Sequence, residues 1–212
     1  MTKKQGGEDP TGQLTPSAVI GAALVVLDER GLDGLSTRAV ADRLGVRMNT
    51  VLWHVKTKGG MLELMADAIL AGVSYDDLPT EPLHCARELA GRYRRALLAH
   101  RDGAALVTGT YSAEPHTLRF ADHLVDALLR TGMNEERAAW TAWTISYFTL
   151  GLTQEEQAAP EASDERLART VDPDAHPALH RVLPHLRQNF EERFAFGLEM
   201  ILARKPSAGI AN

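Results

Sequence analysis

The sequence predicts an all-α fold, with a small N-terminal module followed by a larger helical domain. Ten prolines divide the 212 residues into long proline-free stretches, which suit helices because proline is excluded from helix interiors. Apolar residues recur at helical spacing within those stretches, and no window shows the alternation and β-branched enrichment typical of strands. With 44% apolar and 24% charged residues, the composition is that of a globular protein with a core.

The first helix is predicted over residues 16–30. A polar, Gly-rich lead over residues 1–13, which we expect to be disordered, precedes it. Thr15 is a suitable N-cap, and Pro16 suits the first helical position because its fixed φ matches the helix. Gly31 ends the pattern. Five apolar residues at helical spacing give this helix one buried face: Val19, Ile20, Ala23, Leu24 and Leu27.

Two short helices and a longer one follow. Ser36 is expected to cap a helix over residues 37–44, and Gly45 ends it because glycine takes the left-handed conformation readily. A third segment covers residues 47–55, with Val51 and Val55 facing the core. The Lys-Gly-Gly sequence at 58–60 is expected to break that segment before an amphipathic helix at about 61–71.

The rest of the chain predicts five more helices, at about 83–100, 104–110, 115–131, 134–157 and 178–203. The polar, Pro- and Ala-rich stretch 158–176 is expected to be a flexible loop. The predicted organisation is therefore a disordered lead (1–13), a small helical module (14–60), a connecting helix and loop (61–82) and a larger helical domain (83–206).

Several classes of protein are disfavoured by the sequence. A single cysteine, Cys85, excludes an intramolecular disulfide and a thiolate metal site, and the longest apolar run is too short to span a bilayer. We therefore expect a soluble, cytoplasmic protein without membrane contact. The chain has no nucleophile elbow, Walker loop or His-Glu-x-x-His motif, so we expect no enzyme, cofactor or metal. His176, His180 and His185 are expected to form an exposed polar cluster, because prolines interrupt their spacing.

Charge is unevenly distributed along the chain. The net charge of −5 taken alone argues against DNA binding, because neutralising phosphates supplies most of the sequence-independent affinity. The first 60 residues, however, carry eight basic and six acidic side chains (+2), whereas the other 152 carry 15 basic and 22 acidic ones (−7). A basic N-terminal part is compatible with DNA binding, although a solvated charged face is the commoner explanation for a short basic window.

The two short helices joined at Gly45 match a helix-turn-helix, in which the second helix enters the DNA major groove. Asn can pair with adenine, Thr with a base edge or a thymine methyl group, and Arg with guanine. A helical hairpin without a ligand is the alternative. The residues predicted on or beside the exposed face are Arg47, Met48, Asn49, Thr50, Leu52 and His54. Arg38 opens the preceding helix and is expected to reach the same groove, and Lys56 and Lys58 follow near phosphates.

The sequence also resembles a known family. The segments GLSTRAVA (34–41), LGV (44–46) and LWHVKTK (52–58) resemble, in identity and spacing, the DNA-binding domain of the tetracycline repressor (TetR) family. RRALL (94–98), RDGA (101–104), GT (109–110), FTLG (148–151) and FGLE (196–199) resemble the effector domain of its tetracycline-binding members. The resemblance covers residues 15–204 except the loop 158–180.

This resemblance implies that residues 14–60 are a helix-turn-helix DNA-binding domain and that residues 83–206 are a ligand-binding and dimerisation domain. It further implies a homodimer that holds two helix-turn-helix units over a palindromic operator and releases DNA when a small-molecule effector binds. Thr37, Arg38, Thr50, Trp53, His54 and Lys58 match DNA-contact or docking positions of the family. Met48, Asn49 and Leu52 fall on contact positions but differ in identity, so we expect a different operator sequence.

The resemblance also implies an effector site. Family members that bind magnesium–tetracycline hold the metal with a histidine, a threonine and a glutamate. Thr110 and Glu155 match two of these positions, but Val107 replaces the histidine and cannot ligate a metal. Ser74 and Leu89 replace polar drug-contacting residues, whereas Tyr93 and His123 keep the character of theirs. We therefore expect a different, more apolar effector, such as an antibiotic or a biosynthetic intermediate.

Aromatic residues gather on the predicted helix 134–157. Trp140, Trp143, Tyr147 and Phe148 occupy more than one face, so some should fill the core or a dimer interface while others, Trp140 and Tyr147 among them, line the cavity. Phe190, Phe194 and Leu198 recur every four residues on the last helix and suit either a four-helix dimer interface or packing within one subunit. A small all-α enzyme or carrier that uses the second-domain cavity is the alternative function.

Overall fold

The computed structural model describes residues 14–111, 113–160, 163–186 and 189–203, and these residues contain helices and no strand. The expected disordered lead, residues 1–13, lies outside the described residues, as do residues 204–206 of the second predicted domain. In chain order the helices are α1 (Pro16–Gly34), α2 (Thr37–Leu44), α3 (Met48–Val55), α4 (Lys58–Leu70), α5 (Pro82–Leu98), α6 (Gly103–Thr108), α7 (Pro115–Arg130), α8 (Glu135–Ala158), α9 (Ser163–Thr170), α10 (Pro177–Val182) and α11 (Phe190–Leu202), with a 3₁₀ turn at Leu183–His185.

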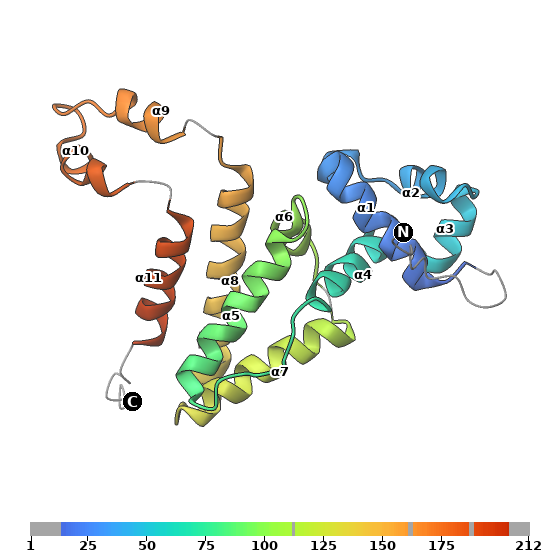
Figure 1. The fold of residues 1–212 in the computed structure, drawn as a ribbon, viewed down its shortest axis with the longest axis horizontal. Helices are drawn as coiled ribbons and strands as arrows, with labels where there is room; N and C mark the ends of the chain where they lie inside the picture. Colours follow the sequence, from blue (N-terminus) through green and yellow to red (C-terminus); the bar gives the residue numbers. More distant parts are fainter. Residues whose placement is uncertain (1–13, 112, 161–162, 187–188, 204–212) are drawn as a thin grey trace, which may run out of the picture.

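Helices α1, α2 and α3 form the head, a three-helix unit at one end of the molecule (Figure 1). The predicted caps are confirmed: the side chain of Thr15 accepts the backbone N–H of Ala18, and that of Ser36 accepts the N–H of Ala39. Gly31 has φ 70° and interrupts the helical conformation of α1 where the sequence predicted its end. The head is therefore built by the local signals that the sequence carries.

Helix α4 begins three residues earlier than predicted, so the expectation that residues 58–60 break the helix is wrong. The side chain of Thr57 caps α4 by accepting the N–H of Gly60 at 2.9 Å. Gly60 fits because a Cβ there would lie 2.6 Å from the carbonyl oxygen of Val55. The glycines thus allow α3 and α4 to meet at a tight corner. Helix α4 then runs from the head into the rest of the molecule (Figure 1).

The body consists of α5, α6, α7, α8 and α11. Helix α8 packs against α5, α6, α7 and α11, and the core includes Leu89, Leu97, Leu124 and Ile145, all at most 1% exposed. Phe148 of α8 stacks on Phe194 of α11, with ring centroids 5.9 Å apart. For the stripe formed by Phe190, Phe194 and Leu198, the structure therefore places Phe194 and Leu198 in the core of one subunit.

The chain between α8 and α11 differs from its prediction. The stretch 158–176 contains a short helix, α9, where only a loop was expected, with Asp164 and Glu165 favourably placed in its first turn. The helix predicted over 178–203 is interrupted: α10 ends at Val182, Pro184 lies in the 3₁₀ turn, and Asn189 caps a separate α11. Residues 163–186 form an arm that stands out beyond α8 and α11 (Figure 1).

Candidate nucleic-acid interface and effector site

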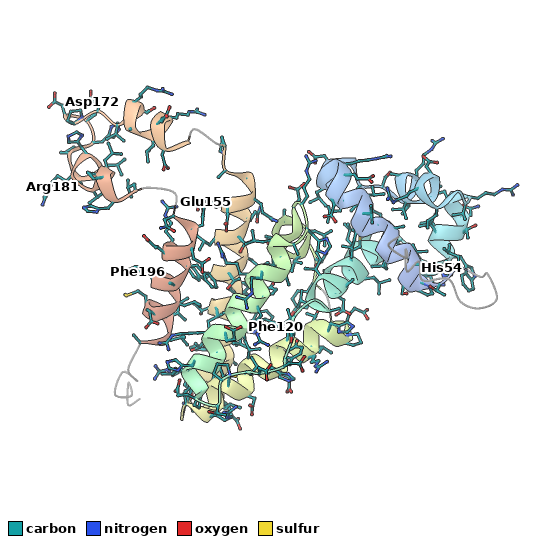
Figure 2. All side chains as sticks on the ribbon, viewed as in Figure 1. His54, Phe120, Glu155, Asp172, Arg181 and Phe196 are labelled. Atoms are coloured by element: carbon teal, nitrogen blue, oxygen red, sulfur yellow. The ribbon has the colours of Figure 1, made fainter. Side chains whose placement is uncertain are left out.

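Helix α3 presents a row of exposed side chains on the head. Val51 and Val55 are buried, as predicted, and they fix which face of α3 turns outward. Arg47, Met48, Asn49 and Thr50 are exposed, while Leu52 and His54 are partly buried. Figure 2 shows His54 at the end of the molecule farthest from α11. The predicted base-reading residues therefore share one outward-facing surface.

The end of α3 and the start of α4 carry Trp53, Lys56 and Lys58 beside that surface. Trp53 is 70% exposed, and the Nζ atom of Lys56 lies 5.6 Å from the centroid of its ring. Lys56 has φ 64°, a conformation rare for a residue with a side chain, and its ammonium donates to the carbonyl of Trp53 at 2.9 Å. Lys58 begins α4 and is exposed. The ammonium groups and the N-terminus of α4 make this corner suitable for phosphates.

The start of α2 completes the surface. Arg38 is exposed and Thr37 is partly buried, at the second and first positions of the helix. Gly45, with φ 67°, supplies the left-handed turn between α2 and α3. All ten residues predicted to contact DNA therefore lie on α2, on α3 with its cap Arg47, or at the start of α4. An exposed, polar and basic surface of this kind is chemically suited to contact with DNA.

A set of hydrogen bonds ties the head to the body. The carboxylate of Asp28 on α1 lies 3.2 Å from Nδ1 of His100 and accepts the backbone N–H of Arg101 at 3.1 Å. The backbone N–H of Leu32 donates to Asp102 at 2.8 Å. Gln157 of α8 braces the same turn by donating to the carbonyl of His100 and accepting the N–H of Ala104. The position of the head is therefore coupled to the turn between α5 and α6.

Two of the predicted effector residues lie deep in the body. Leu89 is fully buried and Tyr93 is 3% exposed, with its ring 4.6 Å from that of Phe120. Burial raises the pKa of the Tyr93 hydroxyl well above its ordinary value, so this group stays protonated and can donate a hydrogen bond to a ligand. Figure 2 shows Phe120 on α7 in the middle of the body.

Three more predicted effector residues lie on α7 and at the end of α6, two helices that pack against α5. His123 is partly buried and contacts the ring of Tyr75, whose centroid is 4.3 Å away. Val107 and Thr110 are partly buried at the end of α6, and the Thr110 hydroxyl donates to the carbonyl of Val107 at 3.0 Å. Val107 thus places a hydrocarbon side chain beside Thr110, a pair unsuited to holding a metal-bound drug.

The remaining four predicted effector residues lie on the surface of the subunit. Glu155 pairs with Arg193 at 3.3 Å, and Trp140 and Tyr147 are each 66% exposed on α8. Ser74 is exposed in the loop after α4. Of the nine predicted effector residues, Leu89 and Tyr93 therefore lie buried on α5, Val107, Thr110 and His123 are partly buried on or just after α6 and on α7, and the other four are exposed.

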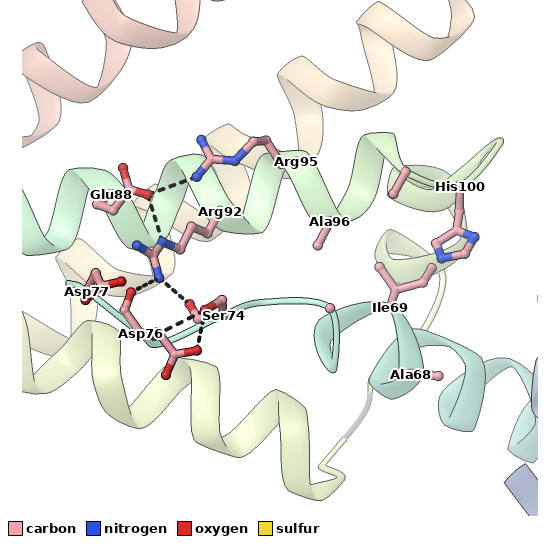
Figure 3. A pocket seen from close by; sticks show the side chains of 12 residues that line it. Ala68, Ile69, Ser74, Asp76, Asp77, Glu88, Arg92, Arg95, Ala96 and His100 are labelled. Carbon is pink, nitrogen blue, oxygen red and sulfur yellow. Dashed lines mark hydrogen bonds and ion pairs between the residues drawn. The ribbon is translucent and has the colours of Figure 1, made fainter.

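A cavity of about 510 Å³ lies between the end of α4 and α5 (Figure 3). Ser74 lines it, together with Glu88, Arg92, Arg95 and His100. Arg92 fastens the loop after α4 by donating to the carbonyls of Ser74 and Asp76, and it also pairs with Glu88 at 2.7 Å. Most of the charged side chains that line the cavity therefore pair with one another or with the loop. His100, which contacts the head, lies at one end of the cavity.

Exposed apolar side chains gather on α8 and α11. Trp143 and Tyr147 stack with ring centroids 5.6 Å apart, and Phe196 is 68% exposed on α11, on the side facing away from α5 (Figure 2). We call this set the apolar face; its members are Trp140, Trp143, Tyr147, Phe196 and Met200. Exposed apolar patches of this kind mark interaction surfaces, and a two-fold pairing of α8 and α11 would cover it.

Three residues that make contacts at these sites were not identified from the sequence: Tyr75, Asp28 and His100. Tyr75 lies between Arg119, whose guanidinium carbon is 4.3 Å from the ring, and His123. Asp28 and His100 join the head to the body. The charged and polar residues at 100–102, directly after α5, were the available signal for the contact between head and body. Their polar groups need hydrogen-bonding partners, and α1 supplies them.

The described part of the chain has no helix that is long and apolar enough to cross a membrane.

Comparisons with known proteins agree on one family. Residues 19–65 match the family model described as bacterial regulatory proteins, tetR family, and residues 84–204 match the model of the tetracyclin repressor-like C-terminal domain. The tetracycline repressor protein class E of Escherichia coli is 35% identical over 193 residues, covering 90% of each chain.

Two solved structures from Streptomyces coelicolor are similar to this chain. A possible TetR family transcriptional regulator of strain A3(2) is 33% identical, with a TM-score of 0.80 and coverage of 89% of this chain and 97% of that one. The TetR family protein ActR, in complex with actinorhodin, is 26% identical with a TM-score of 0.81, covering 90% of this chain and 94% of that one.

Proposed function

The chain belongs to the TetR family of bacterial regulatory proteins, and from this premise we propose that it is a ligand-responsive transcriptional repressor. It binds a palindromic operator in double-stranded DNA as a homodimer and leaves the DNA when a small-molecule effector occupies the body. The observation that carries this proposal is the row of exposed side chains on α3, supported by two buried valines and flanked by Arg38 and Lys58.

The repressor works through the spacing of its two heads. Dimeric helix-turn-helix proteins contact half-sites about 10 base pairs apart or multiples of that spacing, so a small change in head position weakens binding. Asp28, His100 and Asp102 couple each head to the α5–α6 turn. An effector that binds one arrangement of the body more tightly shifts the population toward it and thereby misaligns the heads.

We propose a predominantly apolar, oxygen-bearing effector. Leu89 and Val107 contribute hydrocarbon, and the protonated Tyr93 hydroxyl, Thr110 and His123 offer a few hydrogen-bonding groups, which is the usual composition of a small-molecule site. The structure of ActR in complex with actinorhodin supports a small-molecule ligand for a similar fold. Val107 argues against magnesium–tetracycline.

No catalysis is part of this proposal. The relatives are regulatory proteins, and the residues gathered around Tyr93 include no nucleophile paired with a base. A repressor acts on the chromosome, so we place the protein in the cytoplasm.

A gel-shift assay on the DNA upstream of the gene, with candidate ligands added, tests the proposal. We expect a specific complex that weakens steeply as salt increases and that an apolar effector dissociates. Absence of any salt-dependent specific complex would contradict the proposal and favour an all-α enzyme or carrier. Tight, metal-dependent release by tetracycline with Mg²⁺ would contradict the effector class alone.

A further inference from the structure

A buried carboxylate lies where α4 crosses the start of α7. Asp67 of α4 is 7% exposed, and its Oδ1 atom accepts the backbone N–H of Thr117 at 2.8 Å and the Thr117 hydroxyl at 3.0 Å. Burying a carboxylate is costly unless hydrogen bonds compensate for the lost water. The two donors of Thr117 therefore fix Asp67 at this point of α7.

Thr117 lies in the first turn of α7, where backbone N–H groups need an acceptor such as a carboxylate. Thr117 is the third residue of α7, and the N–H groups of a first helical turn have no partners within the helix. Glu114 precedes the helix but makes no side-chain cap among the described residues. Asp67 thus caps α7 from another helix, with its negative charge at the positive end of the helix dipole.

Helix α4 connects the two functional parts of the molecule. It packs against α1 and α3 of the head and against α5, α6 and α7 of the body. Helix α7 carries Phe120 and His123, which lie at the predicted effector site. Consequently, α7 cannot shift its first turn relative to α4 without breaking hydrogen bonds to a buried charge.

A second contact extends this connection. The ring of Tyr75, in the loop after α4, lies between the guanidinium of Arg119 and the imidazole of His123, both on α7. Burial raises the pKa of Tyr75, and the Arg119 charge lowers it by a smaller amount. Both α4 and the loop that follows it contact the first two turns of α7. We therefore expect these three segments to move together.

We propose that Asp67 is a positioning residue that transmits changes between the effector side of α7 and the head. The proposal rests on the proposed DNA-binding function. Coupling between two sites is reciprocal, so DNA bound at the head must also change the first turn of α7 through Asp67. The coupling can therefore be measured with DNA, before any effector is identified.

Hydrogen exchange of the full chain, with and without an operator duplex selected by the protein from random DNA, tests this inference. In the wild type we expect DNA to change exchange both in the head and in residues 115–123. Asp67→Ala should retain the change in the head and lose the change in 115–123. Asp67→Asn keeps the side-chain size and one acceptor oxygen, so it should retain the change in 115–123.

Thr117→Val provides a second test because it removes the side-chain hydroxyl, keeps the backbone N–H and preserves the volume, so it applies even if Asp67→Ala does not fold. We expect a reduced response in residues 115–123 with the head response intact. The inference is overturned if the wild type shows no DNA-dependent change in 115–123, or if neither Thr117→Val nor a folded Asp67→Ala reduces that change. If the head itself gains no protection, the proposed DNA-binding function fails instead, and the inference fails with it.

Discussion

Arg38 is the residue whose contribution to DNA recognition is simplest to isolate. It is exposed at the start of α2, and no ion pair holds its guanidinium among the residues that the structure describes. Arg38→Ala should weaken operator binding by about 1–3 kcal/mol if the side chain reads a base. Fluorescence anisotropy with a labelled operator measures this change. Arg166→Ala on α9 removes the same charge far from the head and should leave the affinity nearly unchanged; equal effects of the two variants would contradict base reading.

Arg94 allows two ion pairs of different burial to be compared. Its guanidinium, 7% exposed, lies 2.7 Å from Glu156 and 2.6 Å from Glu191, whose side chains are 27% and 78% exposed. Glu156→Ala should lower the free energy of unfolding by roughly 2 kcal/mol, because it leaves a buried charge with only a solvated partner. Glu191→Ala should cost less than about 1 kcal/mol. Urea unfolding measures both, and a larger loss for Glu191→Ala would contradict this ranking.

The surface residues of the head could be predicted from sequence, but several buried polar residues could not. Thr50, Trp53 and Lys58 are recognisable because a helix-turn-helix fixes, within a short segment, which positions face outward. Asp67 and Thr117 are 50 residues apart, and nothing local indicates that an aspartate on α4 will cap α7. Contacts between distant segments depend on how the helices pack against one another. The periodicity of a single helix does not reveal that packing.

At the scale of the elements, Gly45 shows how one residue determines the helix-turn-helix. A Cβ at Gly45 would have no atom within 4 Å, so Gly45→Ala tests the cost of φ 67° without a steric clash. We expect a loss of about 1–2 kcal/mol in the free energy of unfolding. Gly21→Ala, in the middle of α1 and equally unobstructed, should instead stabilise the protein by about 0.5–1 kcal/mol. Thermal unfolding distinguishes them, and a shift of the same sign in both variants would contradict the argument.

Helix boundaries were predicted well where caps are local and poorly where they are not. Ser36 and Gly45 bound α2 at the predicted residues. The start of α4 was misplaced because Gly59 and Gly60 were interpreted as a break, although Thr57 caps the helix and the corner requires a glycine. Pro184 was a visible signal that the helix predicted over 178–203 is interrupted. Helix α9 was not predicted because its sequence is very polar, with only Leu167 and Ala168 as apolar residues.

At the scale of the whole molecule, we propose that two subunits pair through the apolar face, which would hold two heads together. Trp143→Arg should place a charge in the centre of the two-fold interface and yield monomers at concentrations where the wild type is dimeric. Sedimentation velocity measures the assembly state. Tyr111→Arg is the matched control, because Tyr111 is 85% exposed but lies outside the apolar face. A dimer that survives Trp143→Arg unchanged would mean that another surface joins the subunits.

The distribution of charge along the chain affects how the molecule orients as it approaches DNA. The first 60 residues carry a formal charge of +2 and the rest carry −7. Phosphates attract the head and repel the body, which favours a head-first approach and limits non-specific binding. The overall charge of −5 is therefore consistent with a DNA-binding protein whose larger part has another task.

A footprint of the full chain on the DNA upstream of its gene tests the central claim most directly. The account predicts a protected palindrome whose two half-sites lie on one side of the duplex, with centres about one helical turn or a multiple of it apart. Such a pattern requires two heads, held in a fixed relation, that read sequence. Uniform weak protection, or a single unpaired half-site, would contradict it.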